Sequence, residues 1–334
     1  MRWSLLAPMP MRASEARRPL STGRIDDETA LASATMLTVA GEALMDLIAD
    51  ASGALVPRPG GGAFNVARFA AQLGVPCTYL GPLSRDSFGD LLRTALLDAG
   101  VTLAVPEPTD VPTTLALARL DESGAADYRF YVHATAAAQL DHADVRDGLL
   151  ASSRALVLGG IVMAVDPARQ ALLALADSAP ENLVVLLDPN CRPDVITDIS
   201  EYRETVASIQ RRADVLKLSA EDIAVLAPGC DPQEYALDAL AHGPSVVIVT
   251  DGAGDLLLAR ADGVRRLPVP ETEVVDTIGA GDAFVAGFLR WLLSNAAIDL
   301  PEITLDELQD GVESAMRVAA AVCSMRGATL PIDG

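Results

Sequence analysis

Short apolar runs and segments of helical periodicity alternate along the chain from about residue 36 onward. Continuous apolar runs bounded by polar residues or glycine are typical of strands buried on both faces, and we expect such strands at residues 37–41, 78–83, 155–158, 183–187, 215–218 and 246–249. Apolar residues at helical spacing predict helices that include residues 63–73, 87–99 and 283–293. This order predicts an α/β arrangement: a central, mostly parallel sheet with helices on both faces.

Two segments do not follow this alternation. Residues 45–57 and 113–132 have extended, alternating polar and apolar patterns, and residues 121–124 (DESG) read as the turn of a hairpin. We expect these segments to form a small β-sheet lid, with lid segments at about 44–58 and 112–133 of a single domain spanning residues 36–332. Residues 1–35 are expected to be a disordered N-terminal extension without a catalytic role, or an over-long gene start with Met36 as the natural first residue.

Composition excludes several classes of protein. The chain has 334 residues with 25 basic and 46 acidic side chains, a net charge of −21, which argues against nucleic-acid binding because that requires a basic face. Its four cysteines include no CxxC pair, which argues against a zinc knuckle or a thioredoxin-type site and is typical of a cytoplasmic protein. No run of about 18 apolar residues is present, so we expect no membrane association.

The segment 276–284 (DTIGAGDAF) carries the strongest chemical signal. A Gly-Ala-Gly turn leads directly into an apolar helical run, so backbone N–H groups at a helix N-terminus can approach an anion closely. Asp282 follows at once, where its carboxylate can accept a proton from a nucleophile that attacks a bound phosphate. The alternative is an ordinary helix start in which Asp282 is merely a first-turn acid.

The segment 59–67 (PGGGAFNVA) is a second glycine-rich turn that enters a helix. Asn65 falls in the first turn, and its amide can both donate to and accept from a polyol. Asp46 follows the first strand, near the edge of the sheet where ligands bind in open α/β folds. A simple loop with a helix-start asparagine, and a solvated loop acid, are the alternatives.

Taken together, the two glycine segments resemble the signatures of the ribokinase-like (PfkB) family of carbohydrate kinases, over about residues 36–332. Within that family the chain is most similar to the bacterial fructokinase branch. The similarity to that branch includes the segments 41–48 (GEALMDLI), 81–89 (GPLSRDSFG), 112–120, 128–132, 188–193 (DPNCRP) and 217–222 (KLSAED).

The resemblance implies a kinase that transfers the ATP γ-phosphoryl group to a sugar hydroxyl. It implies that Asp282 is the general base and that the amides of Gly279, Ala280 and Gly281 form an anion hole. It further implies a sugar site formed by Asp46, Gly60, Gly61 and Asn65. The nucleotide site that it implies is formed by Asn190, Lys217, Thr250 and Gly252. ATP and Mg²⁺, together with K⁺, are the implied cofactors, and a homodimer formed through the lid is the implied assembly.

Two positions depart from the family pattern. The family's magnesium-linked NxxE segment reads Ser219-Ala220-Glu221-Asp222 here, so the water-mediated magnesium contact expected at Asp222 differs in detail. Asp255 stands where the nucleotide loop usually has a glycine.

Fructose is the expected substrate, with 2-keto-3-deoxygluconate, ribose or a nucleoside as alternatives. A catalytically silent sugar- or nucleotide-binding regulator on the same fold is a further alternative. The sequence lacks the glycine motif of a P-loop and that of a dinucleotide-binding site, which argues against a P-loop protein and a dinucleotide oxidoreductase.

Overall fold

A computed structural model of the chain describes residues 37–49, 53–120, 126–141, 144, 150, 153–294 and 300–331. The expected N-terminal extension and the turn at residues 121–124 lie outside the described residues. Among the residues described, no helix has the length and apolar character needed to cross a membrane.

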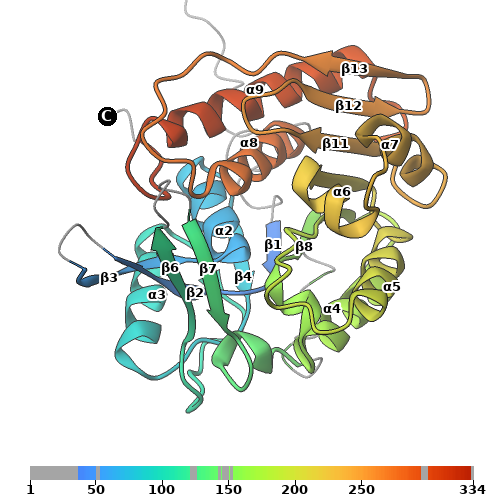
Figure 1. Cartoon of the computed structure of the whole chain (residues 1–334). Coiled ribbons are helices and arrows are strands. Elements are labelled where there is room, and N and C mark those ends of the chain that lie inside the picture. Colours follow the sequence, from blue (N-terminus) through green and yellow to red (C-terminus); the bar gives the residue numbers. More distant parts are fainter. Residues whose placement is uncertain are drawn as a thin grey trace, which may run out of the picture. The chain divides into compact units, whose positions relative to one another are not determined.

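A nine-stranded sheet forms the centre of the fold, in the order β13-β12-β11-β10-β9-β8-β1-β4-β5 (Figure 1). Neighbouring strands are parallel from β5 to β11, whereas β12 and β13 form an antiparallel hairpin at one edge. The strands are β1 (Leu37–Ala40), β4 (Cys77–Leu80), β5 (Thr102–Leu103), β8 (Ala155–Gly159), β9 (Val184–Asp188), β10 (Val215–Ser219), β11 (Val246–Thr250), β12 (Leu256–Arg260) and β13 (Gly263–Leu267). The sheet confirms the predicted fold class, although the β12–β13 hairpin was not among the predicted strands.

Helices cover both faces of this sheet because alternate side chains of each strand point to opposite faces. Val184 and Leu186 of β9 pack into the apolar cluster with α2, α3, α8 and α9, whereas Val185 and Leu187 pack into the cluster with α4 to α7. The helices are α2 (Gly62–Gln72), α3 (Ser87–Asp98), α4 (Ala168–Ser178), α5 (Ile199–Gln210), α6 (Ala220–Leu226), α7 (Pro232–Leu240), α8 (Ala280–Ser294) and α9 (Leu305–Cys323), with short 3₁₀ helices at Ala136–Gln139 and Ile161–Ala164.

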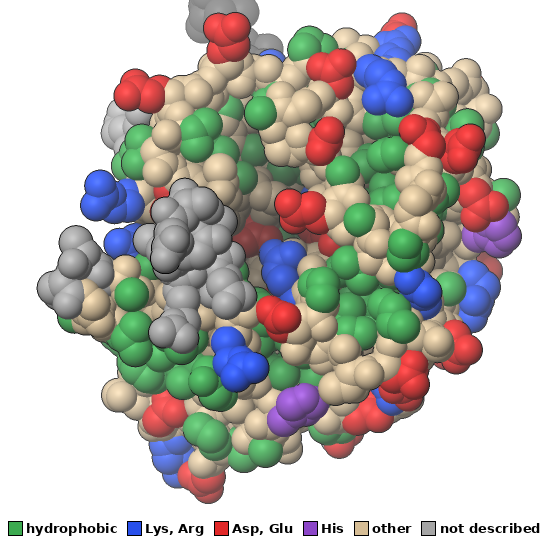
Figure 2. Space-filling view, viewed as in Figure 1, with side chains coloured by type: hydrophobic (Ala, Val, Ile, Leu, Met, Phe, Trp, Pro, Cys, Tyr) green, Lys and Arg blue, Asp and Glu red, His purple; other side chains and the backbone are tan. Residues whose placement is uncertain are grey.

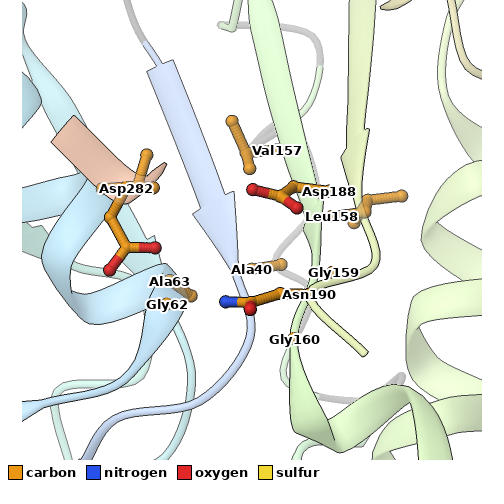
Figure 3. A pocket seen from close by; sticks show the side chains of 11 residues that line it. Ala40, Gly62, Ala63, Val157, Leu158, Gly159, Gly160, Asp188, Asn190 and Asp282 are labelled. Atoms are coloured by element: carbon orange, nitrogen blue, oxygen red, sulfur yellow. The ribbon is translucent and has the colours of Figure 1, made fainter. Parts of the chain in front are cut away.

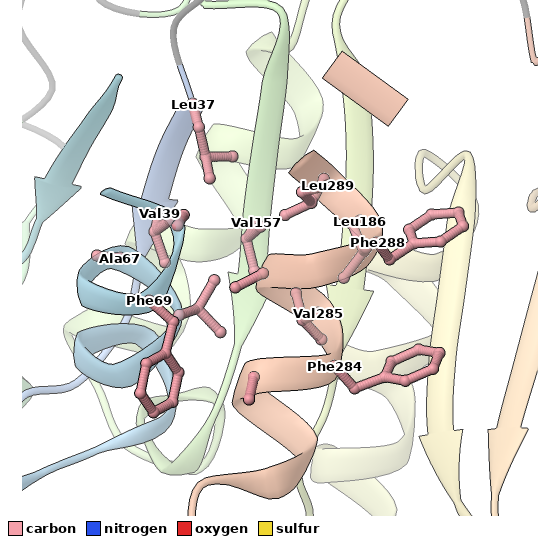
Figure 4. Close-up of a cluster of buried hydrophobic side chains, with 14 of the residues drawn as sticks. Leu37, Val39, Ala67, Phe69, Val157, Leu186, Phe284, Val285, Phe288 and Leu289 are labelled. Atoms are coloured by element: carbon pink, nitrogen blue, oxygen red, sulfur yellow. The ribbon is translucent and has the colours of Figure 1, made fainter. Parts of the chain in front are cut away.

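Helices α2 and α8, which carry the two glycine segments, lie side by side on one face of the sheet. Phe69 of α2 and Phe284 and Phe288 of α8 are buried in one apolar cluster with Val39 of β1 (Figure 4). This packing fixes the N-terminal turns of the two helices relative to each other.

A separate four-stranded sheet has the order β3-β2-β6-β7. It consists of β2 (Leu44–Ala49), β3 (Leu55–Gly60), β6 (Thr114–Leu120) and β7 (Ala126–Tyr131). The β6–β7 hairpin is antiparallel as predicted, while β2 and β6 pair in parallel. The two segments expected to form a lid therefore form one sheet, and its function as a lid remains a prediction.

The order in which successive strands are added to the central sheet reverses at β1. It proceeds from β1 to β4 and β5 on one side and then returns to β8 on the other side of β1. Ligands in open α/β sheets bind at the carboxyl ends of the strands beside such a switch point. A binding site is therefore expected beyond Ala40 of β1 and Gly159 of β8.

Candidate active site

The start of α2 is held against the end of β1 by backbone hydrogen bonds. Gly61 has a φ of 108°, and a Cβ there would lie 2.7 Å from the carbonyl oxygen of Glu42, so only glycine fits this turn without strain. The N–H of Phe64 donates to the carbonyl oxygen of Glu42 at 3.2 Å, and the N–H of Asn65 donates to that of Gly61 at 2.9 Å. These contacts place Asn65 in the first turn of α2, as predicted.

The loop before α8 is shaped by Asp276. Its Oδ1 accepts from the N–H of Ile278 at 3.0 Å, and its Oδ2 accepts from the N–H of Gly327, beyond α9, at 2.9 Å. This carboxylate therefore fixes the entry to the Gly-Ala-Gly turn.

The predicted anion hole is partly occupied by the turn itself. The N–H of Ala280 donates to the carbonyl oxygen of Thr277 at 3.2 Å. The N–H groups of Gly281 and Asp282 have no acceptor within the described part of the chain, as is usual for the first turn of a helix. The N–H of Gly279 also has no acceptor within the described part of the chain, so two of the three predicted amides, those of Gly279 and Gly281, are available.

Asn65 and Asp282 meet between the two helices. Nδ2 of Asn65 donates to Oδ2 of Asp282 at 2.8 Å, and the two residues are only 4% and 9% exposed. The structure thus joins the two glycine segments through their polar side chains.

The Asp282 carboxyl group lies in a site that resists ionisation. Burial raises its pKa to about 6; the hydrogen bond from Asn65 opposes this shift, Asp188 adds to it, and Lys217 and Arg192 oppose it. The group is therefore mostly ionised at neutral pH and more basic than an ordinary aspartate, which suits a general base.

A buried ion pair lies on the other side of the site. Nζ of Lys217 on β10 donates to Oδ2 of Asp188 at the end of β9, at 2.9 Å. Burial lowers the pKa of Lys217, but the carboxylates of Asp188, Asp222 and Asp282 outweigh it, so the ammonium stays charged. A Cβ on Gly281 would lie 3.3 Å from this Nζ, which places the ammonium beside the free amides of α8.

A cavity that opens to solvent lies between Asp282 and Asp188. Asp282 lies on one side of it and Asp188 and Asn190 on the other, as Figure 3 shows. Its lining residues are Ala40, Gly62, Ala63, Val66, Val157, Leu158, Gly159, Gly160, Asp188, Asn190 and Asp282. Figure 2 shows a hollow on the corresponding face in which acidic and basic side chains lie close together.

Asp46 lies on strand β2 of the small sheet rather than in a loop. It is half-buried and pairs in register with Arg58 of β3, and a Cβ on Gly60 would lie 2.1 Å from its Oδ2. Burial, with repulsion from Asp282, raises the pKa of Asp46 to about 7. Because Asp46 in turn contributes to the raised pKa of Tyr128 on β7, an aromatic side chain of the small sheet lies near this carboxyl group.

Thr250 and Gly252 lie further along the same edge of the central sheet. Thr250 ends β11 in register with Ser219 of β10, and its Oγ1 donates to the carbonyl oxygen of Leu218 at 3.3 Å. Gly252 is exposed, with a φ of 54°. The structure places both residues at the carboxyl ends of the strands but gives neither a contact with Asp282.

Both carboxylate oxygens of Asp222 accept hydrogen bonds from the protein. Its Oδ1 accepts from the N–H of Cys191 at 2.6 Å, and its Oδ2 accepts from the N–H and hydroxyl of Ser219, both at 2.7 Å. Among the residues that the structure describes, no group of three His, Cys, Asp or Glu side chains is arranged to hold a metal ion.

Four charged residues belong to this site although the sequence analysis gave them no role. They are Glu42, Asp188, Arg192 and Asp276. Glu42 and Asp188 could have been identified from the sequence, since each stands at or just after the end of a predicted buried strand. A charged residue in such a buried position requires a partner.

The chain is similar to known proteins over most of its length. The profile of the family described as pfkB family carbohydrate kinase matches residues 34–333. A fructokinase from Rhizobium leguminosarum bv. trifolii is 31% identical over 277 residues, covering 81% of this chain and 84% of that protein.

Two solved structures are also similar. A Vibrio cholerae O395 fructokinase double mutant, in a form with bound fructose, ADP and potassium ion, matches with a TM-score of 0.77 at 27% identity, covering 89% of this chain and 94% of that one. An aminoimidazole riboside kinase from Salmonella enterica, complexed with aminoimidazole riboside and an ATP analogue, matches with a TM-score of 0.77 at 26% identity, covering 88% and 95%.

Proposed function

The chain belongs to the PfkB family of carbohydrate kinases, and we propose that it transfers the ATP γ-phosphoryl group to a hydroxyl group of fructose. As a member of that family, the protein is a phosphotransferase that acts on a sugar hydroxyl. The observation that carries the proposed mechanism is the position of Asp282: its buried carboxylate accepts from Asn65 and lies beside the cavity and the unpaired amides of α8.

In the proposed mechanism Asp282 is the general base. Its carboxylate accepts the proton of the attacking sugar hydroxyl, while Asn65 holds one of its oxygens in place. The turn formed by Gly279, Ala280 and Gly281 is proposed to hold the negative charge of the transferring phosphoryl group. The amide of Gly281 is available for this role, whereas that of Ala280 first has to leave the carbonyl oxygen of Thr277.

We propose that ATP binds along the carboxyl edge of the sheet through Asn190, Lys217, Thr250 and Gly252. The residues present fit a magnesium-bound nucleotide, because Oδ1 of Asp188 is a buried oxygen without a hydrogen-bond partner in the described part of the chain. Magnesium, when bound, neutralises charge on the phosphate oxygens and needs few protein ligands. Asp222 is proposed to contact it through water only, since both of its oxygens already accept protein donors.

A monovalent cation is also part of the proposal. The Vibrio cholerae relative has been solved with potassium ion, fructose and ADP bound. We propose that K⁺ activates this enzyme, and comparison of its initial rates in KCl and in tetramethylammonium chloride tests this.

Fructose is the proposed sugar because several relatives at about 30% identity are fructokinases. Asp46, Gly60, Gly61 and Asn65 are proposed to hold its hydroxyl groups from the side of the small sheet. Aminoimidazole riboside kinases are also similar to this chain, so a riboside is the second candidate.

An assay of ADP release across fructose, ribose, 2-keto-3-deoxygluconate, adenosine and aminoimidazole riboside tests the substrate. We expect the highest kcat/KM with fructose, and a higher value with another sugar would replace fructose as the substrate. Sugar binding by calorimetry without ADP release from any of the five would favour the silent regulator.

We also propose a homodimer formed through the small sheet acting as a lid, in the cytoplasm. Leu55 and Val56 on the edge strand β3, and Tyr131 on the edge strand β7, are exposed apolar residues of the kind that pairing covers. Light scattering of the wild type and of a Leu55→Lys variant tests the dimer, and equal masses for the two would remove β3 from the interface.

A further inference from the structure

Glu42 is a buried acid directly beneath the start of α2. It is 2% exposed, and its Oε1 accepts from the N–H of Gly62 at 2.9 Å. Its Oε2 has no hydrogen-bond partner within the described part of the chain. Burying a carboxyl group with one oxygen unpaired is costly, so the position calls for a functional explanation.

Helix α2 has no cap of its own. Its N-cap residue is Gly61, which has no side chain, and its first turn contains no acidic residue. The orphan N–H groups of a helix start need an acceptor, and a carboxylate at that end is favoured by the helix dipole. Glu42, twenty positions earlier in the chain, supplies that acceptor from the end of β1.

Glycines on both sides make room for this carboxyl group. A Cβ on Gly160, just after β8, would lie 2.0 Å from Oε2 of Glu42. A Cβ on Gly62 would lie 3.3 Å from Oε1 of Glu42, 3.2 Å from Nδ2 of Asn190 and 3.7 Å from Oδ1 of Asp282. Gly62 and Gly160 both line the cavity, so Glu42 lies directly behind its wall and close to the proposed base.

We propose that Glu42 is a positioning residue for phosphoryl transfer: its carboxyl group fixes the first turn of α2 and thereby the Asn65–Asp282 hydrogen bond. This inference rests on the kinase reaction proposed above but not on the identity of the sugar. Because a reacting group displaced by about 1 Å can cost about a hundredfold in rate, loss of this support is expected to reduce kcat.

Asp282 acts on Glu42 through charge. Burial raises the pKa of Glu42 to about 7, the Gly62 amide opposes this shift, and the nearby Asp282 carboxylate adds to it. The other charged groups that face Asp282 are Asp46, Arg68, Asp188, Arg192 and Lys217. Since the pKa of Glu42 lies above that of Asp282, Glu42 is mostly protonated in the pH range where Asp282 titrates, and a neutral isostere at position 42 is expected to leave the pKa of Asp282 nearly unchanged.

Two variants separate the structural and electrostatic contributions. In Glu42→Ala the acceptor is lost, so we expect kcat to fall by about 10- to 100-fold and amide hydrogen exchange in the first turn of α2 to accelerate. Glu42→Gln keeps an acceptor for Gly62, so we expect wild-type hydrogen exchange, kcat within about threefold of wild type, and an acidic limb of the kcat–pH profile that stays in place.

A matched control is Glu307→Gln. Glu307 accepts from the N–H of Thr304 at the exposed start of α9, so the same chemical change is made at a helix start outside the site. It is expected to leave hydrogen exchange of α2 and the pH profile unchanged.

Wild-type hydrogen exchange in Glu42→Ala, or a loss of kcat in Glu42→Gln as large as that in Glu42→Ala, would overturn the proposal. If Glu42→Ala fails to fold, Glu42→Met, which keeps the volume of the side chain but has no acceptor, takes its place. The assay uses whichever of the five sugars the wild type phosphorylates, so failure with fructose alone affects only the substrate assignment. If none is phosphorylated, the kinase proposal fails, and hydrogen exchange of α2 still decides the positioning role of Glu42.

Discussion

Nδ2 of Asn65 donates a hydrogen bond to Oδ2 of Asp282 at 2.8 Å, across 217 positions of sequence. The contact joins the first turn of α2 to the first turn of α8, and both residues are buried. It brings together the asparagine and the aspartate of two glycine-rich segments that are far apart in the chain. The proposed sugar site and the proposed base are therefore parts of one site.

Asp282→Asn is expected to reduce kcat by about 10²- to 10⁴-fold, since an amide cannot accept the proton of the sugar hydroxyl. Binding of sugar and of ATP is expected to persist, because the turn of α8 and the first turn of α2 are unchanged. Steady-state kinetics and calorimetry check these two statements separately. A kcat near that of the wild type would remove Asp282 from the mechanism.

Asn65→Ala is expected to move the acidic limb of the kcat–pH profile to higher pH. The hydrogen bond from Asn65 favours the ionised form of Asp282 and opposes the rise that burial causes in its pKa, which stands at about 6. Without that bond the pKa of Asp282 rises, so a larger fraction of the base is protonated and inactive at a given pH. An acidic limb that stays in place would contradict this expectation.

Asp46→Ala is expected to raise the KM for the sugar far more than the KM for ATP. Asp46 lies on β2 of the small sheet beside Gly60, whereas we propose that ATP binds along the carboxyl edge of β9 to β11 in the central sheet. Initial rates at varied concentrations of each substrate measure both constants. Equal effects on the two constants would place Asp46 outside the sugar site.

The free energy of unfolding is expected to fall as pH rises from about 4 to about 7. The pKa values of Asp46 and Asp282 are raised in the folded state, to about 7 and about 6, so the folded protein binds more protons than the unfolded chain in this window. Asp46→Asn removes one of these groups and is expected to gain about 1–2 kcal/mol in stability at pH 8 relative to wild type. Urea unfolding at about pH 5 and pH 8 measures this, with Glu107→Gln at an exposed position as the control.

Lys217→Met is expected to destabilise the fold by about 3–5 kcal/mol, because it leaves the buried Asp188 carboxylate without its partner. The double variant Lys217→Met/Asp188→Asn is expected to recover part of this loss, since the uncompensated charge is removed. Arg85→Met breaks an exposed ion pair with Asp110 and is expected to cost less than about 1 kcal/mol. If Lys217→Met and Arg85→Met lowered the free energy of unfolding by similar amounts, this would argue against a strongly buried Lys217–Asp188 pair.

Much of the fold was predictable from local patterns. Continuous apolar runs identified the parallel strands except the two-residue β5, and helical spacing after each glycine segment identified α2 and α8. The antiparallel β12–β13 hairpin was missed, since β12 (LLLAR) is a short apolar run without a distinctive turn signal. The segment containing Asp46 was expected to be extended, but only the register of β2 with β3 and β6 shows that this residue belongs to the small sheet.

The sequence by itself determined which backbone segments are suited to bind an anion and which residues stand at the starts of the two helices, because glycine content and periodicity are local properties. Only the tertiary structure decided that Asn65 meets Asp282, that Lys217 pairs with Asp188, and that Glu42 supplies the missing cap of α2. Distances between remote side chains depend on strand order and helix packing, and the pKa values depend on the burial that this packing creates. Neither quantity can be read from the spacing of residues along the chain.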